Sequence, residues 1–346
     1  MRSRIYINGA EQISIQEPLC ENWMDKPVAY DTKYAKSIDP DFKPFISPIE
    51  ARRMGKILKR AIATTATLLK KSGIEKPDAI ITGTGYGCID NSLLFLDALT
   101  NEGEQLLKPT HFMQSTHNTI SSLLAIQTKN HGYNVTYSHK GISFDSALFD
   151  AYMQFLLGKI GSAVVGSFDE VSQRFFMILE KGGILGGSSK GIAGEAAVSI
   201  MLSNNPEGAL CELASMRLLY KPSIEKFKET IDAMAEEAGI GCDQIDAVMT
   251  GVNGESNNDN IYAEFLANTL EDATLLRYKH IFGESYSASG IGMYAAAQCL
   301  SRQAIPEHIK YERDMQRNKA RNILVMNHSE GKNFTLTLMK EHACGR

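Results

Sequence analysis

A serine between a short strand and an amphipathic helix is the first candidate for chemistry. Residues 134–137 are predicted to form a strand, the turn Ser138-His139-Lys140-Gly141 follows, and apolar residues recur at helical spacing over 144–156. These are the parts of a nucleophile elbow, in which the positive end of the helix dipole stabilises an anionic or acylated side chain. Ser138 is therefore the candidate nucleophile. His139 is a doubtful base for it, because adjacent residues in such a turn generally point apart.

The glycine-rich segments favour plain turns over nucleotide-binding loops. Residues 83–87 lack the GxGxxG spacing, and residues 182–187 lack the Lys-Ser/Thr ending of a P-loop. No two His or Cys residues show ligand spacing on one element, so we expect neither a metal site nor a cofactor. The cysteines, without CxxC spacing, are expected to be reduced thiols of a cytoplasmic protein, and Cys88 to be a packed thiol. They are Cys20, Cys88, Cys211, Cys242, Cys299 and Cys344.

A repeated pattern indicates which elements position the site. Residues 78–83 (Asp-Ala-Ile-Ile-Thr-Gly) recur as residues 246–251 (Asp-Ala-Val-Met-Thr-Gly), roughly 170 residues later. Each copy follows a small-Gly-Ile turn and precedes an Asp-Asn pair, at 90–91 and 259–260. We interpret this as a duplicated α/β unit, although any helix-turn-strand unit can end in this way. The active site of a duplicated unit lies where its halves meet.

The helices around these strands carry boundary signals. Ser47, with Pro48 and Glu50 after it, forms a capping box that opens a first helix, which Gly73 ends. Ser223 is the expected cap of the equivalent helix in the second half. Helices that alternate with short apolar strands predict an α/β fold whose sheets are covered on both faces. We expect two halves, 1–195 and 196–346, packed as one body, with buried strands at 79–81 and 247–249. Residues 164–167 and the apolar run 196–202 lie between these two strands, near the boundary of the halves.

Bulk composition excludes several classes of protein. The chain of 346 residues, with a formal net charge of −4, has no basic excess for a nucleic-acid or membrane surface. No apolar run approaches a membrane span, and the polar start Met1-Arg2-Ser3-Arg4 lacks a signal-peptide core. These features predict a cytosolic protein that binds neither nucleic acid nor membrane.

Nearly the whole chain resembles the β-ketoacyl-(acyl carrier protein) synthase family. The family's early signature resembles residues 52–54 and 81–87, its nucleophile segment lies over 136–141, and later segments resemble 161–167 and 194–197. This family has the thiolase fold. The resemblance therefore implies two homologous halves with mixed sheets, in α-β-α-β-α layers around a pair of buried central helices.

The chain departs from this family at each catalytic position. The family's cysteine nucleophile corresponds to Ser138, its first histidine to Gly251 and its second histidine to Glu284, whereas the lysine before the second histidine is kept as Lys279. Further positions that the resemblance places around the pocket and oxyanion region are His117, Asn253, Asp259, His328 and Asn333.

These replacements remove the groups that condensation needs. A thiolate takes the acyl group, and two neutral histidines stabilise the enolate left by malonyl decarboxylation. Serine is a far poorer nucleophile without a base, Gly251 offers no donor, and an ionised Glu284 would repel the malonyl carboxylate. Because loss of one oxyanion donor typically costs roughly a hundred- to thousandfold in rate, we expect no decarboxylative condensation.

The resemblance then implies a ketosynthase-like subunit of fatty acid or polyketide-type biosynthesis. Chain-length-factor subunits of type II polyketide and aryl polyene systems pair with an active ketosynthase and shape its acyl pocket. Such factors often carry glutamine at the cysteine position, so Ser138 is a departure. One alternative is an acyltransferase that uses Ser138 as acyl carrier with Glu284 tuning it. The other is a homodimeric acyl-binding protein.

The same resemblance implies two interaction surfaces. One is a dimer interface across the strand that precedes residue 138, formed with a catalytic ketosynthase subunit or with a second copy of this chain. The other is a basic patch that docks an acyl carrier protein carrying an acyl or malonyl group. Its candidate residues are Arg313, Arg317, Lys319 and Arg321. Glu312 and Asp314 reduce the positive charge of this segment, which can also be interpreted as a solvated charged segment.

Overall fold

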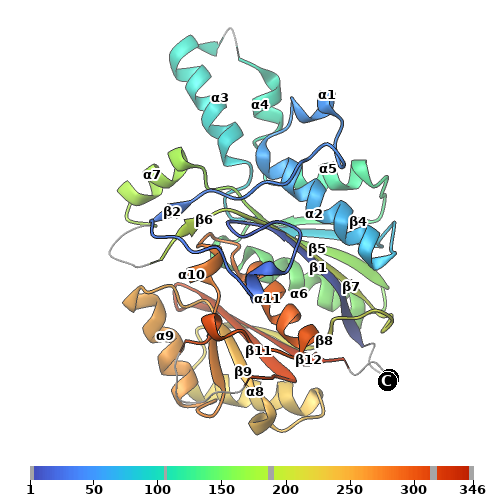
Figure 1. Cartoon of the computed structure of the whole chain (residues 1–346), viewed down its shortest axis with the longest axis vertical. Helices are drawn as coiled ribbons and strands as arrows, with labels where there is room; N and C mark the ends of the chain where they lie inside the picture. Colours follow the sequence, from blue (N-terminus) through green and yellow to red (C-terminus); the bar gives the residue numbers. More distant parts are fainter. Residues whose placement is uncertain (1–3, 105–106, 186–190, 312–317, 343–346) are drawn as a thin grey trace.

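A ten-stranded mixed sheet runs through this computed structural model, which describes residues 4–104, 107–185, 191–311 and 318–342 (Figure 1). The strands form two groups of five. The first group is β1 (Ile5–Ile13), β3 (Ala79–Gly83), β4 (Tyr133–Tyr137), β5 (Ser162–Asp169) and β7 (Ala196–Ser203). The second group is β8 (Cys211–Tyr220), β9 (Ala247–Thr250), β10 (Thr274–Arg277), β11 (Asn322–Ser329) and β12 (Asn333–Glu341).

The two groups have the same strand order and directions. The first is ordered β4-β3-β5-β7-β1 and the second β10-β9-β11-β12-β8; the three leading strands of each are parallel and the other pairings antiparallel. The repeated segments therefore occupy equivalent strands, β3 and β9. This confirms the expected α/β fold with two mixed sheets, which antiparallel pairing of Ile5, Tyr6 and Ile7 with residues 211–213 joins at one seam.

The aspartate that opens each copy has the same task in both halves. Asp78 Oδ2 accepts the N–H groups of Gly161 and Ser162 at 2.8 and 3.0 Å, at the start of β5. Asp246 Oδ2 accepts those of Arg321 and Asn322 at 2.8 and 3.1 Å, at the start of β11. Each aspartate thus ties the start of its own strand to the start of the parallel strand beside it, which explains why both copies begin with it.

The first five strands extend beyond residue 195, where we expected the first half to end. β7 begins at Ala196 and pairs with β5 and β1 along its length. The division into 1–195 and 196–346 stays a prediction.

Helices pack on the faces of the sheet, and two of them, α6 (Ser143–Leu156) and α11 (Ser289–Arg302), pack against strands of both groups. The other helices are α1 (Pro48–Ala51), α2 (Lys56–Ser72), α3 (Ile89–Glu102), α4 (Pro109–Met113), α5 (Thr119–Gln127), α7 (Gln173–Lys181), α8 (Ile224–Glu237), α9 (Ser256–Ala267) and α10 (Lys279–Phe282). A small sheet pairs β2 (Tyr34–Ala35) with β6 (Ala193–Gly194). Within the described ranges, none of the helices combines the length and apolarity that crossing a bilayer would need.

The first helix is interrupted, contrary to the sequence prediction. Ser47 and Glu50 form the expected capping box, but α1 ends at Ala51 and α2 begins only after Gly55. A Cβ atom at Gly55 would lie 2.9 Å from Asn91 Nδ2, so the α3 side chain packs directly on the backbone at the break. The expected stop at Gly73 is confirmed, with φ of +70°. Ser223 caps α8 as expected, accepting the N–H of Lys226.

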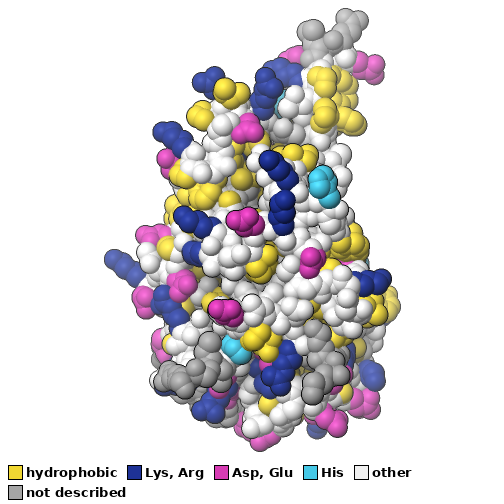
Figure 2. Space-filling view, turned by 90° about the vertical axis from the view of Figure 1, so that its right-hand side faces the viewer, with side chains coloured by type: hydrophobic (Ala, Val, Ile, Leu, Met, Phe, Trp, Pro, Cys, Tyr) yellow, Lys and Arg dark blue, Asp and Glu magenta, His cyan; other side chains and the backbone are white. Residues whose placement is uncertain are grey.

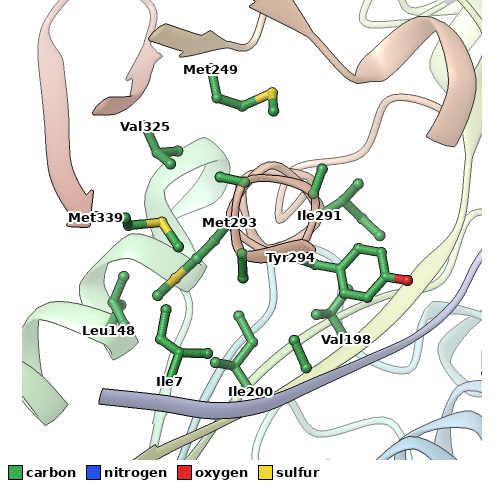
Figure 3. Packing of buried hydrophobic residues seen from close by; sticks show 14 of the residues in the cluster. Ile7, Leu148, Val198, Ile200, Met249, Ile291, Met293, Tyr294, Val325 and Met339 are labelled. Atoms are coloured by element: carbon green, nitrogen blue, oxygen red, sulfur yellow. The ribbon is translucent and has the colours of Figure 1, made fainter. Parts of the chain in front are cut away.

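The core is built around α6 and α11. Residues 289–300 of α11 are all buried, and side chains from both groups of strands surround the helix, including Ile7 and Ile200 from the first and Met249 and Val325 from the second (Figure 3). Small residues permit this close packing: a Cβ at Gly292 would lie 2.7 Å from the Tyr278 ring. The two helices are the buried central pair that the resemblance implied.

Candidate functional site

A cavity of about 170 Å³ lies where segments of the two halves meet, beside the N-terminus of α11. One side is the turn after β4, another the loops after β9 and α10, and a third the hairpin between β11 and β12. The lining residues are Tyr86, Lys140, Gly141, Ile184, Leu185, Asn253, Glu255, Asn258, Lys279, Glu284, Ser285, Tyr286, Ala288, Ser289, Asn327, His328, Ser329 and Glu330. The cavity therefore contains several of the predicted site residues.

An ion pair occupies the centre of the site. Lys279 Nζ lies 2.7 Å from Glu284 Oε2 and 2.9 Å from Oε1, and the two side chains are only 10% and 15% exposed. Asn253 Nδ2 also donates to Glu284 Oε2, at 3.1 Å. The backbone places Glu284 after Gly283, whose φ of +86° suits glycine. Because each charge already has a partner, the Lys279 ammonium is not free to bind an anionic substrate.

The loop after β9 is fixed by its own polar groups. Asp259, in the first turn of α9, accepts the N–H groups of Asn253 and Gly254 at 3.0 and 2.9 Å. Asn258 Nδ2 donates to Asn253 Oδ1 at 3.1 Å. The carboxylate also lies at the favourable end of the α9 dipole. Asp259 is therefore a structural anchor that orients Asn253 toward Glu284.

Gly251 has no space for a side chain. A Cβ atom there would lie 2.5 Å from Tyr262 Oη and 3.2 Å from Lys279 Cε. Tyr262 is buried in α9, with its ring centroid 4.5 Å from that of His328. The space in which a residue-251 side chain would begin is thus filled by a tyrosine hydroxyl.

His328 lines the cavity, and both nitrogens of its neutral imidazole are hydrogen-bonded to the protein backbone. Its Nε2–H donates to the Asn258 carbonyl at 3.2 Å, and Nδ1 accepts the N–H of Gly331 at 3.3 Å. Burial lowers the pKa of His328 to about 4. The imidazole is therefore uncharged at neutral pH, and both nitrogens are engaged by the protein.

Ser138 lies outside the cavity. It is exposed, and helix α6 begins only at Ser143, after a 3-10 turn over Lys140–Ile142. Lys140, with φ of +47°, and Gly141 line the cavity instead. Asn327 Nδ2 fixes this turn by donating to the Gly141 carbonyl at 2.9 Å. A catalytic role for Ser138 stays a prediction.

Two buried carboxylates that sequence reasoning missed hold the N-terminus of α11. Asp145 of α6 accepts from Ser289 Oγ at 2.7 Å and also from side chains of β11 and β12. Asp169, at the end of β5, accepts from the Ser287 N–H at 2.6 Å and from the glycine turn over 84–86. Burial raises the pKa of both groups. Their partners lie more than 80 residues away in sequence, so no local pattern indicated them.

The other candidates lie elsewhere. His117 is exposed and packs against Gly87, and Asn333 opens β12 opposite Ser329. His280 donates to the His308 carbonyl at 2.8 Å and is not among the described lining residues. Cys88 is buried, as expected, and burial raises the pKa of its thiol.

Only part of the expected basic patch can be placed. Lys319 and Arg321 are exposed, and Arg321 pairs with Glu341 at 3.3 Å. Arg313 and Arg317, with Glu312 and Asp314, lie outside the described residues. Docking of a carrier protein on this patch stays a prediction.

Comparison with known proteins decides the family. A family model for the N-terminal domain of β-ketoacyl synthases matches residues 21–225, more than half of the chain. The chain belongs to the β-ketoacyl synthase family. The aligned region contains β3, the turn at Ser138, α6 and β7. No curated protein sequence matches the chain.

Solved ketosynthase structures share the fold over nearly the full length. The ishigamide ketosynthase/chain length factor has a TM-score of 0.82 at 16% identity, over 99% of this chain and 100% of that chain. A ketosynthase (ApeO) in complex with its chain length factor (ApeC) from Xenorhabdus doucetiae gives 0.77 at 13%, over 98% of each chain. A β-ketoacyl synthase from Burkholderia phymatum STM815 gives 0.77 at 13%, over 99% and 100%. These similarities confirm the thiolase-like fold.

Proposed function

We propose that this chain is a ketosynthase-like subunit of fatty acid or polyketide-type biosynthesis that does not itself catalyse condensation. It pairs with an active ketosynthase and shapes the pocket that receives the acyl chain. The observation that carries the proposal is that Glu284 and Gly251 stand at the family's two histidine positions and that neither has space or free groups for the histidine's role. Glu284 is bound to Lys279 and Asn253, and Gly251 backs onto the Tyr262 hydroxyl. Neither position can supply the neutral donor that stabilises an enolate.

The cavity itself is a poor receptacle for an acyl chain. Its volume of about 170 Å³ is below the roughly 300–1,000 Å³ typical of ligand pockets. Both lysines that line it are already paired, Lys279 with Glu284 and Lys140 with Glu330 at 3.2 Å. At either lysine a malonyl carboxylate would therefore compete with a carboxylate of the protein. This supports a subunit that contributes shape to a partner rather than chemistry of its own.

The edge strand β4 is the surface proposed for the partner. It pairs with β3 on one side, and no strand of the described residues pairs with its other edge, whose backbone groups can therefore pair with a second chain. Around it lie exposed Ile126 of α5, Tyr133, and Met153 and Leu157 at the end of α6. Figure 2, which looks onto the right-hand side of Figure 1, shows hydrophobic side chains in patches among lysines and arginines. Two solved relatives are named as pairs of a ketosynthase with a chain length factor, which supports a partner of this type.

Co-expression with candidate ketosynthases tests the partnership. We expect a stable heterodimer that Ile126→Asp disrupts, because the charge would be buried beside β4. Ile178→Asp is the matched control, since Ile178 is exposed on α7 (48%, against 72% for Ile126) and away from β4. A homodimer that excludes every candidate ketosynthase would instead favour the acyl-binding alternative.

Intact-protein mass after incubation with an acyl-loaded carrier protein tests the chemistry. We expect no adduct on the wild-type chain, and no carbon–carbon bond formation from malonyl-carrier protein by Ser138→Cys. A mass gain that disappears in Ser138→Ala would make Ser138 a working nucleophile and would favour the acyltransferase alternative. The proposal includes an acyl carrier protein as the donor to the pair and places the chain in the cytoplasm, where its five described cysteines, all free thiols, would stay reduced.

A further inference from the structure

Helices α3 and α4 form an arm that projects from the sheet (Figure 1). The arm exposes large apolar side chains, among them Leu94, Leu96 and Phe112. Its links to α7 include the Arg174–Asp97 ion pair, whose Nη2–Oδ1 distance is 2.6 Å. The first turn of α3 contacts the residue that follows β5, through the hydrogen bond of the Asp90 N–H to Glu170. The interactions of this turn therefore help to attach the arm to the sheet.

A glutamate from another element caps α3. Glu170, directly after β5, is 1% exposed, and its Oε2 accepts the N–H of Asp90 at 3.1 Å. Cys88, the residue at the N-cap position, supplies no side-chain hydrogen bond. Glu170 Oε1 is buried and has no hydrogen-bond partner among the described residues. Among the described residues, the hydrogen bond from the Asp90 N–H to Glu170 Oε2 is therefore the only one that caps the first turn of α3 from a side chain, and Glu170 Oε1 has no partner.

Charges from three packed elements face this carboxyl group. Asp90 of α3 and Glu195, after β6, are acidic, and Arg60 of α2 is the cation. Arg60 is already bound to Glu195 at 2.9 Å and to Asp39 at 2.6 Å. The buried Cys88 thiol is also close enough to interact with Glu170. An ionised Glu170 would therefore be an additional buried negative charge in a cluster whose cation is committed elsewhere.

Burial, followed by the neighbouring Asp90 carboxylate, raises the pKa of Glu170 to about 7. The group thus changes charge in the neutral pH range, whereas a solvated glutamate ionises near 4.5.

We propose that Glu170 is a proton-controlled clasp between the arm and the sheet: protonated, it holds the first turn of α3 in place, and ionised, it favours release of that turn. Release exposes the carboxylate to water, which relieves its desolvation and its repulsion by Asp90 and Glu195. Release must therefore become more favourable as the pH rises from about 4.5, where the released Glu170 ionises, to about 7, where the buried Glu170 ionises. At higher pH Glu170 is ionised in both states, and the equilibrium between them no longer depends on pH.

Hydrogen exchange of the amides at 89–92 measures this equilibrium after correction for intrinsic exchange rates. In the full-length wild type the opening constant should rise by at least about tenfold between pH 5.5 and 7.5. Glu170→Gln, which keeps the shape and the acceptor without the charge, should show no rise, and its opening constant should be about tenfold below that of the wild type already at pH 5.5, one unit above the ordinary glutamate pKa of 4.5. A flat wild-type profile, or a Glu170→Gln variant that keeps the rise, would overturn the proposal.

Variants of α3 give an independent test that does not change the buried residue. Asp90→Asn removes the negative charge that contributes most to raising the pKa of Glu170, so the rise should be complete at lower pH. Asp97→Asn is the control, because it removes a carboxylate of the same helix that contacts Arg174 rather than Glu170. Equal shifts in the two variants would exclude a specific role for the Asp90–Glu170 pair and would contradict the clasp.

Discussion

Adding one methyl group at Gly251 is expected to lower the free energy of unfolding by about 1–3 kcal/mol. The new Cβ would lie 2.5 Å from Tyr262 Oη, against 3.4 Å for the shortest ordinary contact, an overlap of 0.9 Å (3.4 − 2.5). Tyr262 cannot swing aside, because it is buried and its ring lies against His328. Lys279 cannot yield either without separating from Glu284.

The companion variant is Tyr262→Phe, which removes the clashing oxygen. We expect Gly251→Ala/Tyr262→Phe to recover most of the lost stability, so that the two changes are strongly non-additive. Gly161→Ala is the matched control, because its Cβ would meet only ordinary contacts, the nearest at 3.4 Å. Urea unfolding followed by fluorescence of the single, buried Trp23 reports each free energy.

Two results would refute this reasoning. One is a Gly251→Ala variant as stable as Gly161→Ala, which would mean that the site has room for a side chain. The other is a double variant no more stable than Gly251→Ala, which would mean that Tyr262 is not the obstacle. Either outcome would also remove one support for a site closed to the family's histidine.

Three further changes test packing, charge and capping by the same urea assay. Glu284→Gln should lower the free energy of unfolding by about 3 kcal/mol, because it leaves the buried Lys279 ammonium uncompensated. The double variant Lys279→Met/Glu284→Gln should regain most of this stability. A Glu284→Gln variant as stable as the wild type would show that the pair is not buried in solution. Leu148→Ala should cost about 2–5 kcal/mol through the cavity left beside α11, whereas Leu157→Ala, at an exposed position, should be nearly neutral; equal losses would contradict the assigned core. Ser47→Ala should cost about 1 kcal/mol by removing the capping box of α1, and no loss would mean that this turn does not contribute to stability.

Local patterns predicted the elements that local forces determine. The apolar spacing over 144–156 gave α6 with both ends within a residue, and the repeated segments gave β3 and β9 in equivalent places. Ser223 and Gly73 act as the caps that their types suggested. In each case the deciding interaction lies within a few residues of the signal.

Long-range contacts decided what the sequence could not show. The break before α2 depends on Asn91 packing on Gly55, and the turn after Ser138 depends on Asn327, 186 residues from the carbonyl that it binds. The partner of Glu284 was also missed, although Lys279 precedes it by only five residues and was already a candidate. A carboxylate that replaces a histidine near a retained lysine is a signal that could have predicted the ion pair.

The paired tasks of Asp78 and Asp246 have a consequence for assembly of the molecule. Each carboxylate binds the first amides of the strand next to its own, so the alignment of neighbouring parallel strands is specified inside each half. The contacts that align neighbouring parallel strands thus occur twice along the chain, once in each half. Each half can therefore align its parallel strands before the two halves pack together.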